Sequence, residues 1–199
     1  MAGVSEAAAG LIRRRLEDSL AVKRDMLESG CISQAGVAAA AIIDALRAGG
    51  KVLFFGNGGS SMDAGHLAAE LAGRFYRDRP GLAAVSLADA TAALTAIAND
   101  YAYDEVFARQ VRALGRPGDV AVGLTTSGNS GNVVNALTAA GMGGLFTVAL
   151  TGSSGGKVAA AADVCIRVPT DDTPRVQEAC LHLGHTICEI VEREMFPGT

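Results

Sequence analysis

Stretches in which apolar side chains recur at helical spacing occupy both ends of the chain. One runs from Ser5 to about Ser29, and a second runs from Ser33, its expected N-cap, to a glycine stop at residues 49–50. A last amphipathic helix is expected from about Pro174 to Met195. The pattern therefore predicts two helices before the first strand and one helix after the last.

Five short runs between these helices are continuously apolar rather than alternating. They span residues 51–55, 83–87, 119–124, 145–150 and 163–168, and helix-compatible segments separate them. Such runs are typical of parallel strands that are buried on both faces. We therefore expect an α/β fold of flavodoxin-like type, a three-layer α-β-α sandwich around a five-stranded parallel sheet. Ligands bind such sheets beyond the carboxyl ends of the strands.

Length and composition are those of one domain. The chain has 199 residues, of which 49% are hydrophobic, which is enough for a sizeable core. We expect a single domain over residues 1–199, with N-terminal helices in residues 1–50 and an α/β core in residues 51–199. The four cysteines show no CxxC spacing, so reduced core thiols are expected.

The charge pattern and the hydropathy argue against nucleic acid and membrane partners. The formal net charge is −4, and the one basic run, residues 13–15, lies inside an amphipathic helical pattern. No segment has the features of a secretory signal, and none gives 18 uninterrupted apolar residues. We therefore expect a soluble, cytoplasmic protein.

Two turns rich in glycine and hydroxyl groups follow strands of the predicted sheet. Residues 56–61 read Gly-Asn-Gly-Gly-Ser-Ser after the first run, and residues 125–131 read Thr-Thr-Ser-Gly-Asn-Ser-Gly after the third. Free backbone N–H groups, hydroxyl donors and a helix N-terminus together bind an oxyanion. Either turn alone could be glycine-rich for backbone reasons. Two of them at the same end of one sheet indicate a phosphorylated ligand.

Two other phosphate-binding motifs fit less well. The turns lack the lysine of a Walker A loop, so ATP hydrolysis is disfavoured. Gly56 and Gly58 match a dinucleotide fingerprint, but Ser61 stands where its third glycine belongs, and Asp78 comes before the second strand instead of at its end.

Several polar side chains could act on a bound sugar phosphate. They are His66, Glu70, Asp100, Gln177 and His185. His66 and Glu70 are four residues apart, so on a helix they share a face and could chelate a metal or place an acid beside a base. The plainer alternative is a helix face with Asp63 and His66 in solvent, and a hydrogen-bonded core histidine at 185. His182 is expected to face outward or toward a neighbouring subunit.

Motifs spread over nearly the whole chain together resemble a known family. They are residues 56–60 with Asp63, His66 and Glu70, the Gly73-Arg74 pair, Asn99-Asp100, the loop 126–130, and residues 175–178 with His185. The chain thereby resembles the phosphoheptose isomerases, which have the sugar isomerase (SIS) domain. The resemblance implies conversion of sedoheptulose 7-phosphate into D-glycero-D-manno-heptose 7-phosphate. It also implies a homotetramer with shared active sites, in which residues 1–50 serve oligomerisation.

The resemblance further implies a role for each site residue. Glu70 and His185 would be the acid/base pair. The ligands of one zinc ion per subunit would be His66, Glu70, Gln177 and His185. The phosphate loop would be Thr125, Thr126, Ser127 and Ser130, with Thr125 replacing a serine of some members. The other substrate contacts would be Asn57, Gly58, Gly59, Ser60, Glu70, Arg74, Asn99, Asp100 and Gln177.

Aldose–ketose isomerisation passes through a cis-enediolate and needs a carbon base and an oxygen acid. We assign Glu70 as the base between C1 and C2 and His185 as the oxygen acid, and the reverse assignment stays open. Two points oppose the full metal set. A carboxylate bound to zinc is a poorer base, and the eight residues from Gln177 to His185 span about 12 Å of helix. Either Gln177 lies at a bent helix start, or the metal uses fewer of these groups.

Non-catalytic proteins of the same fold are the competing class. Residues 95–100 and 104–115 also resemble SIS proteins that bind the replication initiator, and a sugar-phosphate sensor is a further alternative. Those regulators replace Glu70 and His185 by groups that do not exchange protons, so the presence of both residues favours an enzyme. Among enzymes, a pentose or hexosamine phosphate isomerase is the nearest alternative.

Overall fold

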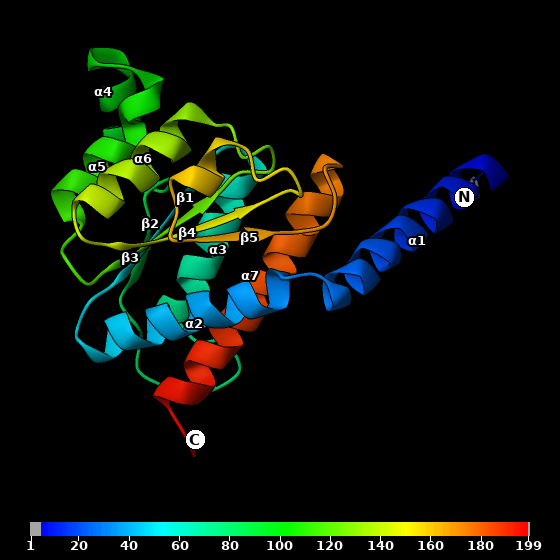
Figure 1. The fold of residues 1–199 in the computed structure, drawn as a ribbon, viewed down its shortest axis with the longest axis horizontal. Helices are drawn as coiled ribbons and strands as arrows, with labels where there is room; N and C mark the ends of the chain where they lie inside the picture. Colours follow the sequence, from blue (N-terminus) through cyan, green and yellow to red (C-terminus); the bar gives the residue numbers. More distant parts are fainter. Residues whose placement is uncertain (1–4, 199) are drawn as a thin grey trace.

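Five parallel strands pair in one sheet in the order β2-β1-β3-β4-β5 in the computed structural model, which describes residues 5–198 (Figure 1). The strands are β1 (Val52–Gly56), β2 (Ala84–Ser86), β3 (Val120–Leu124), β4 (Phe146–Thr151) and β5 (Val164–Arg167). All five lie where continuous apolar runs predicted them. The α/β class and the parallel five-stranded sheet are therefore confirmed.

Helices connect the strands and precede and follow the sheet. They are α1 (Glu6–Glu28), α2 (Cys31–Arg47), α3 (Gly59–Ala72), α4 (Thr91–Asp100), α5 (Val106–Leu114), α6 (Gly131–Met142) and α7 (Thr173–Met195). Short 3₁₀ turns lie at η1 (Tyr103–Glu105) and η2 (Lys157–Ala160). The two helices before the first strand and the long last helix agree with the sequence pattern.

Two hydrophobic cores cover the two faces of the sheet. Phe54, Val122 and Leu150 face the core that α2, α3 and α7 complete. Leu53 and Phe55, which flank Phe54 in β1, face the opposite core, where α5 and α6 pack. Because successive strand residues point to opposite faces and both faces are covered, β1 and β3 are buried at every position and consist of apolar residues and glycine.

The two glycine-rich turns lie side by side at one edge of the sheet. β1 and β3 are neighbours, and Gly56 is paired in register with Leu124, so both strands end at the same level. A side chain at Gly56 would come within 2.8 Å of the carbonyl oxygens of Leu124 and Ser60. The close approach of these backbones therefore requires glycine at the start of the first turn.

One helix boundary differs from the expectation. α2 begins at Cys31 with Gly30 as its N-cap, whereas Ser33 lies within the first turn and donates its hydroxyl hydrogen to the Gly30 carbonyl at 2.9 Å. The prediction of Ser33 as N-cap was wrong because the N-cap is Gly30, three residues earlier, where no side chain caps the helix. Ser5 does cap α1, since its Oγ accepts the Ala8 N–H at 3.2 Å.

The four cysteines are free and buried, as predicted. Burial raises the pKa values of Cys180 and Cys188 to about 12, so both thiols stay protonated at neutral pH. Within residues 5–198 no single helix is long and apolar enough to cross a membrane. Only α1 and α2 taken together, with a 73° bend between them, reach the length and composition of a span.

Candidate active site

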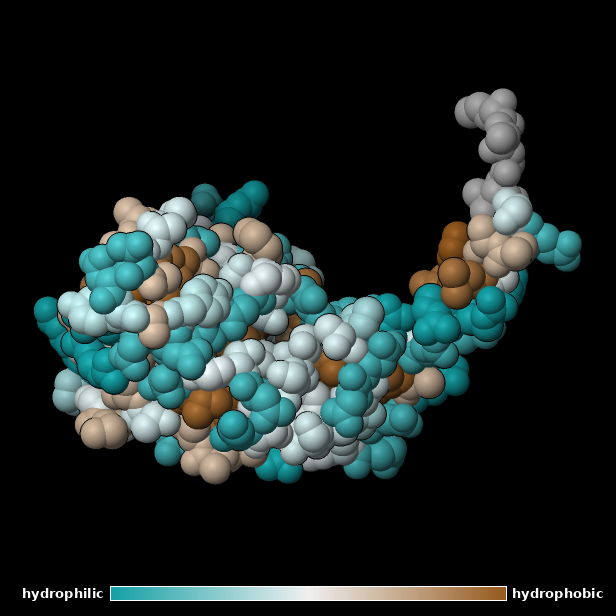
Figure 2. Space-filling view, turned by 90° about the horizontal axis from the view of Figure 1, so that it is seen from above, coloured by the Kyte–Doolittle hydropathy of each residue, from teal (hydrophilic) through white to brown (hydrophobic). Residues whose placement is uncertain are grey.

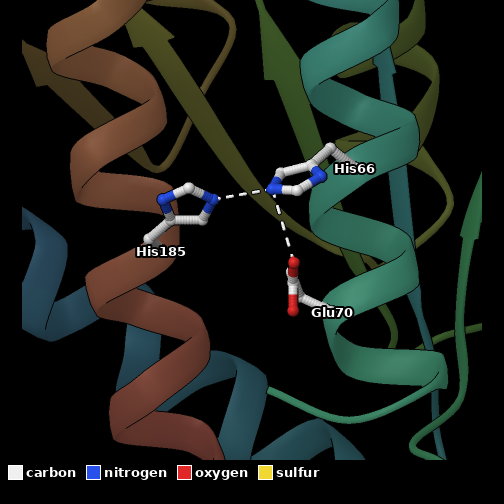
Figure 3. Close-up of side chains that lie close together, drawn as sticks. All are labelled: His66, Glu70 and His185. Atoms are coloured by element: carbon white, nitrogen blue, oxygen red, sulfur yellow. Dashed lines mark hydrogen bonds and ion pairs between the residues drawn. The ribbon is translucent and has the colours of Figure 1, made fainter. Parts of the chain in front are cut away.

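Three titratable side chains from two helices meet at one point. His66 and Glu70 lie one turn apart on α3, and His185 faces them from α7 (Figure 3). The Nε2 atom of His66 is 2.8 Å from Nε2 of His185 and 3.4 Å from Oε1 of Glu70. One ligand atom from each residue lies within 4.8 Å of the other two. The cluster is open to solvent at His66, whose side chain is 47% exposed.

The contact between the two imidazoles requires that one ring donates a hydrogen and the other accepts it, so at least one is neutral. Burial lowers the pKa of His185, and the neighbouring His66 lowers it further, which outweighs the opposite effect of Glu70. His185 is therefore a neutral imidazole near pH 7, able to accept one proton and to return it.

Asp63 is buried and lies one turn before His66 on α3. Its exposed fraction is 8%, so the alternative that placed Asp63 in solvent was wrong. Burial raises the pKa of Asp63, while a hydrogen bond from the Gln177 side chain and the two nearby histidines lower it in part. Because Asp63 lies three residues before His66, helical spacing alone could have predicted that the two side chains share a face of α3.

Gln177 lies beside Asp63 at the start of α3. Its amide packs against the start of α3, where a side chain at Gly59 would collide with it, and it bonds to Asp63. Gln177 lies two turns before His185 on the continuous helix α7. The structure brings His66, Glu70 and His185 together, and a metal contact by Gln177 stays a prediction.

The predicted phosphate loop lies between β3 and the N-terminus of α6. Thr125 and Ser130 close the loop through a contact of 3.0 Å between their hydroxyl oxygens. Ser127 is exposed at the tip, where its Oγ accepts the Asn129 N–H at 3.2 Å. Gly128 has φ of 69° and lies against Gly155 and Gly156, so only glycine fits there. Hydroxyl groups and free N–H groups at a helix start suit a phosphate.

The Asn57 side chain is held by two residues that the sequence did not point to. Asn57 and Asn132 exchange two amide hydrogen bonds of 2.8 Å each. Tyr103 donates its hydroxyl hydrogen to Oδ1 of Asn57 at 2.9 Å. Asn132 follows the phosphate loop, so this pair ties the two glycine-rich turns together.

The remaining predicted contacts are spread over α3, the loop after it and α4. Ser60 is buried at the start of α3, and Arg74 is exposed in the loop after it. Asn99 and Asp100 are exposed at the end of α4, where the Asn99 amide donates to the Asp100 carboxylate at 2.9 Å.

Phe75 is a further residue at the site. Its ring centroid lies 5.8 Å from that of His185 with a tilt of 37°. No pattern in the sequence predicted this contact, because Phe75 lies in an irregular loop. His182, on the same helix, is exposed, in agreement with the expectation that it faces outward.

Comparison with known proteins adds family evidence to this geometry. A model of the SIS domain matches residues 19–152. The chain is 48% identical over 185 residues to a phosphoheptose isomerase of Thermodesulfovibrio yellowstonii, covering 93% of this chain and 92% of the relative. It is 46% identical over 186 residues to phosphoheptose isomerase 2 of Campylobacter jejuni, with the same two coverages. The solved phosphoheptose isomerase of Neisseria gonorrhoeae superposes with a TM-score of 0.87 at 42% identity, over 92% of this chain and 98% of that one.

Proposed function

The chain belongs to the phosphoheptose isomerase family of SIS-domain proteins, and from that premise we propose which of its residues carry the reaction. It is an aldose–ketose isomerase that converts sedoheptulose 7-phosphate into D-glycero-D-manno-heptose 7-phosphate. The assignment of roles rests on one observation: Glu70 and His185 lie on different helices and far apart in the chain, yet their side chains are close together.

Glu70 is the carbon base. Its side chain is 21% exposed at the mouth of the cluster, so a sugar carbon can approach the carboxylate. The carboxylate removes a proton from C1 of the ketose, which leaves a cis-enediolate, and returns a proton to C2 to complete the aldose. A single base on one face of the sugar is sufficient, because C1 and C2 are adjacent.

His185 moves the proton between the two oxygens. Its neutral imidazole accepts the proton of the C1 hydroxyl, and the C2 oxygen receives one proton as the carbonyl shifts from C2 to C1. The balance is one proton moved between carbons and one between oxygens, with no net change of redox state. Phe75 and His66 contact the ring of His185 and limit its orientations.

The loop of Thr125, Thr126, Ser127 and Ser130 holds the phosphate of the substrate. Its hydroxyl groups and the first N–H groups of α6 supply donors, and the helix N-terminus favours the negative charge. Asn57, Gly58, Gly59 and Ser60 form the adjacent turn and contact the sugar hydroxyls. Arg74, Asn99, Asp100 and Gln177 complete the predicted set of substrate contacts.

The three clustered residues fit a zinc ion. Imidazole nitrogen and carboxylate oxygen are ligands that zinc accepts, and two ligand atoms of a tetrahedral zinc ion lie about 3.3 Å apart. The separations of 2.8 Å and 3.4 Å from Nε2 of His66 are close to that value. We propose that one zinc per subunit would be held by His66, Glu70, Gln177 and His185, and that the Glu70 carboxylate would have to be free of the ion while it serves as the carbon base. A zinc ion bound there would polarise the sugar carbonyl.

We also propose a homotetramer, in which α1 packs against other subunits. α1 has 23 residues, of which only Ser19 and Met26 are buried. Figure 2 shows the helix as an arm that projects from the body of the molecule with apolar side chains on its surface. The large apolar residues exposed on α1 are Leu11, Ile12, Leu16, Leu20 and Leu27. A helix with so little buried surface needs a partner to be stable.

A groove of about 420 Å³ continues this apolar surface between α1, α2 and α7. Met26, Leu27, Ile32 and Leu183 line it, together with His182. Continuity of the groove with the exposed face of α1 supports one extended contact surface for a second subunit. We also propose a cytoplasmic location, which suits an enzyme of phosphorylated sugars with reduced cysteines.

The test is to mix the purified protein with sedoheptulose 7-phosphate in D₂O and to follow the sugar by NMR, with and without a chelator. We expect the aldose to form with deuterium at C2, because the proton on the carbon base exchanges with solvent. A Glu70→Gln protein serves as the control without the base. Absence of both aldose and deuterium exchange with the wild-type protein would contradict the proposal. A sensor would bind the sugar without turnover.

A further inference from the structure

A buried ion pair joins the two helices that carry the acid/base residues. Arg79 follows α3, and Glu192 lies on α7, seven residues after His185 and therefore on the same helix face. Nε of Arg79 is 2.9 Å from Oε1 of Glu192, and the two side chains are 0% and 1% exposed. Two charges so fully removed from water are costly unless every donor and acceptor is paired.

The Glu192 carboxylate organises the loop that follows α3. Oε1 accepts the Phe75 N–H at 2.9 Å, and Oε2 accepts the N–H groups of Tyr76 and Arg77 at 2.8 Å and 3.1 Å. Burial by itself would raise the pKa of Glu192, but these N–H groups and the Arg79 guanidinium hold it below its ordinary value. The carboxylate is thus ionised and fixes three consecutive backbone groups.

The Arg79 guanidinium caps the last turn of α3. Its Nη2 donates to the carbonyl oxygen of Glu70 at 2.8 Å, and its Nη1 donates to the carbonyl oxygen of Leu71 at 2.8 Å and to that of Gly73 at 3.1 Å. The last carbonyl groups of a helix have no partner within the helix. Arg79 therefore holds the backbone of Glu70 directly.

The ion pair is connected to both acid/base residues through contacts with the backbone of α3 and the loop that follows it. Through Arg79 it holds the backbone of Glu70, and through Glu192 it holds the loop that presses Phe75 against the ring of His185. Glu192 itself lies two turns from His185 on a continuous helix, so it also sets where α7 lies relative to α3. Neither charged side chain is exposed to substrate.

We propose that Arg79 and Glu192 are positioning residues for the isomerisation, because their ion pair sets the distance between Glu70 and His185. The inference rests on the proposed roles of those two residues. A misplacement of about 1 Å between reacting groups can cost about 10²-fold in rate. A buried ion pair that served stability alone would have no reason to affect turnover more than substrate binding.

The test compares Glu192→Gln with Asp119→Asn. Asp119 is also a buried carboxylate that pairs with a cation, Lys51, and accepts the N–H groups of Lys51 and Arg116. It lies at the start of β3, at the opposite end of the strands from the phosphate loop. Asp119→Asn therefore controls for the loss of a buried carboxylate that pairs with one cation and accepts backbone N–H groups.

We expect kcat of Glu192→Gln to fall about tenfold or more, with KM for sedoheptulose 7-phosphate and the affinity for inorganic phosphate within about threefold of wild type. Asp119→Asn should keep kcat and KM within about twofold, with activity expressed per folded protein from circular dichroism. Equal kcat in folded Glu192→Gln and wild type would overturn the inference, and so would equal losses in the two variants.

Phe75→Leu provides a second route if Glu192→Gln does not fold. It removes the ring contact with His185 and leaves the ion pair in place. We expect kcat to fall about fivefold or more without a change in phosphate affinity, since the aromatic contact restricts the imidazole. An unchanged kcat in Phe75→Leu would overturn the inference in that case. An inactive wild-type protein would instead contradict the proposed function itself.

Discussion

Nε2 of His185 lies 2.8 Å from Nε2 of His66, although 119 residues separate the two histidines in the chain. α3 and α7 pack against the same face of the sheet, and this packing brings the rings together. Glu70 completes the group one turn further along α3 (Figure 3). An imidazole pair beside a carboxylate can serve both proton transfer and metal binding, so the predictions below separate the two.

Glu70→Gln should lower kcat by about 10²-fold or more, because an amide accepts no proton from carbon. Affinity for inorganic phosphate should stay within about twofold, since the phosphate loop lies on other elements. Steady-state kinetics and calorimetric titration measure the two quantities. Glu189→Gln, which breaks only a surface ion pair with Arg193, is the matched control. A wild-type kcat in Glu70→Gln would remove Glu70 from the mechanism.

Ser127→Ala should weaken substrate binding with little effect on kcat. A hydrogen bond to a charged group contributes about 1.5–3 kcal/mol, so we expect KM to rise by about tenfold or more. The matched control is Thr138→Ala, which removes an exposed hydroxyl on α6 that bonds only to its own helix. If KM of Ser127→Ala equals that of wild type, the loop binds another group.

His66→Ala should abolish stoichiometric zinc binding. Loss of one imidazole leaves two of the three clustered ligands, too few for a stable site. Zinc content after dialysis, measured by elemental analysis, should fall from one ion per subunit to a small fraction. His182→Ala removes an exposed imidazole on α7 and should retain the metal. Equal zinc in both variants would place the ion elsewhere.

Leu16→Glu should dissociate the assembly. The Leu16 side chain is 62% exposed on the arm formed by α1, and a charge there would be costly to bury between subunits. Light scattering coupled to gel filtration should shift from four subunits to a smaller species. Glu17→Gln, on the same turn, is the control and should leave the mass unchanged. A wild-type protein that is already monomeric would contradict the tetramer.

Acid should weaken the fold through Glu192. Its pKa is lowered from 4.5 in the folded protein, so its contribution to stability is present above about pH 4.5 and is lost as pH falls through the folded-state pKa. Urea unfolding between pH 3 and 6 measures the slope of the free energy of unfolding against pH. Glu192→Gln should show a shallower slope than wild type. An unchanged slope would mean that this carboxylate has the same pKa in both states.

Much of the fold and part of the site could be predicted because their signals are local. A buried parallel strand must be apolar at each position, and an anion-binding turn needs glycine and hydroxyl groups within a few residues. The resemblance of scattered motifs then pointed to Glu70 and His185. The burial of Asp63 was missed because it is a tertiary property, and the hydrogen-bond partner of its carboxylate, Gln177, lies 114 positions later in the chain.

The order of apolar and polar residues alone determined the α/β class, the five strands and the two turns, because these depend on neighbours along the chain. Only the tertiary structure decided that His66, Glu70 and His185 meet and that Gln177 lies beside Asp63. It also decided that Arg79 and Glu192 join the two helices behind the site. Such contacts between distant segments depend on how helices pack on the sheet, and no local pattern in the sequence encodes that packing.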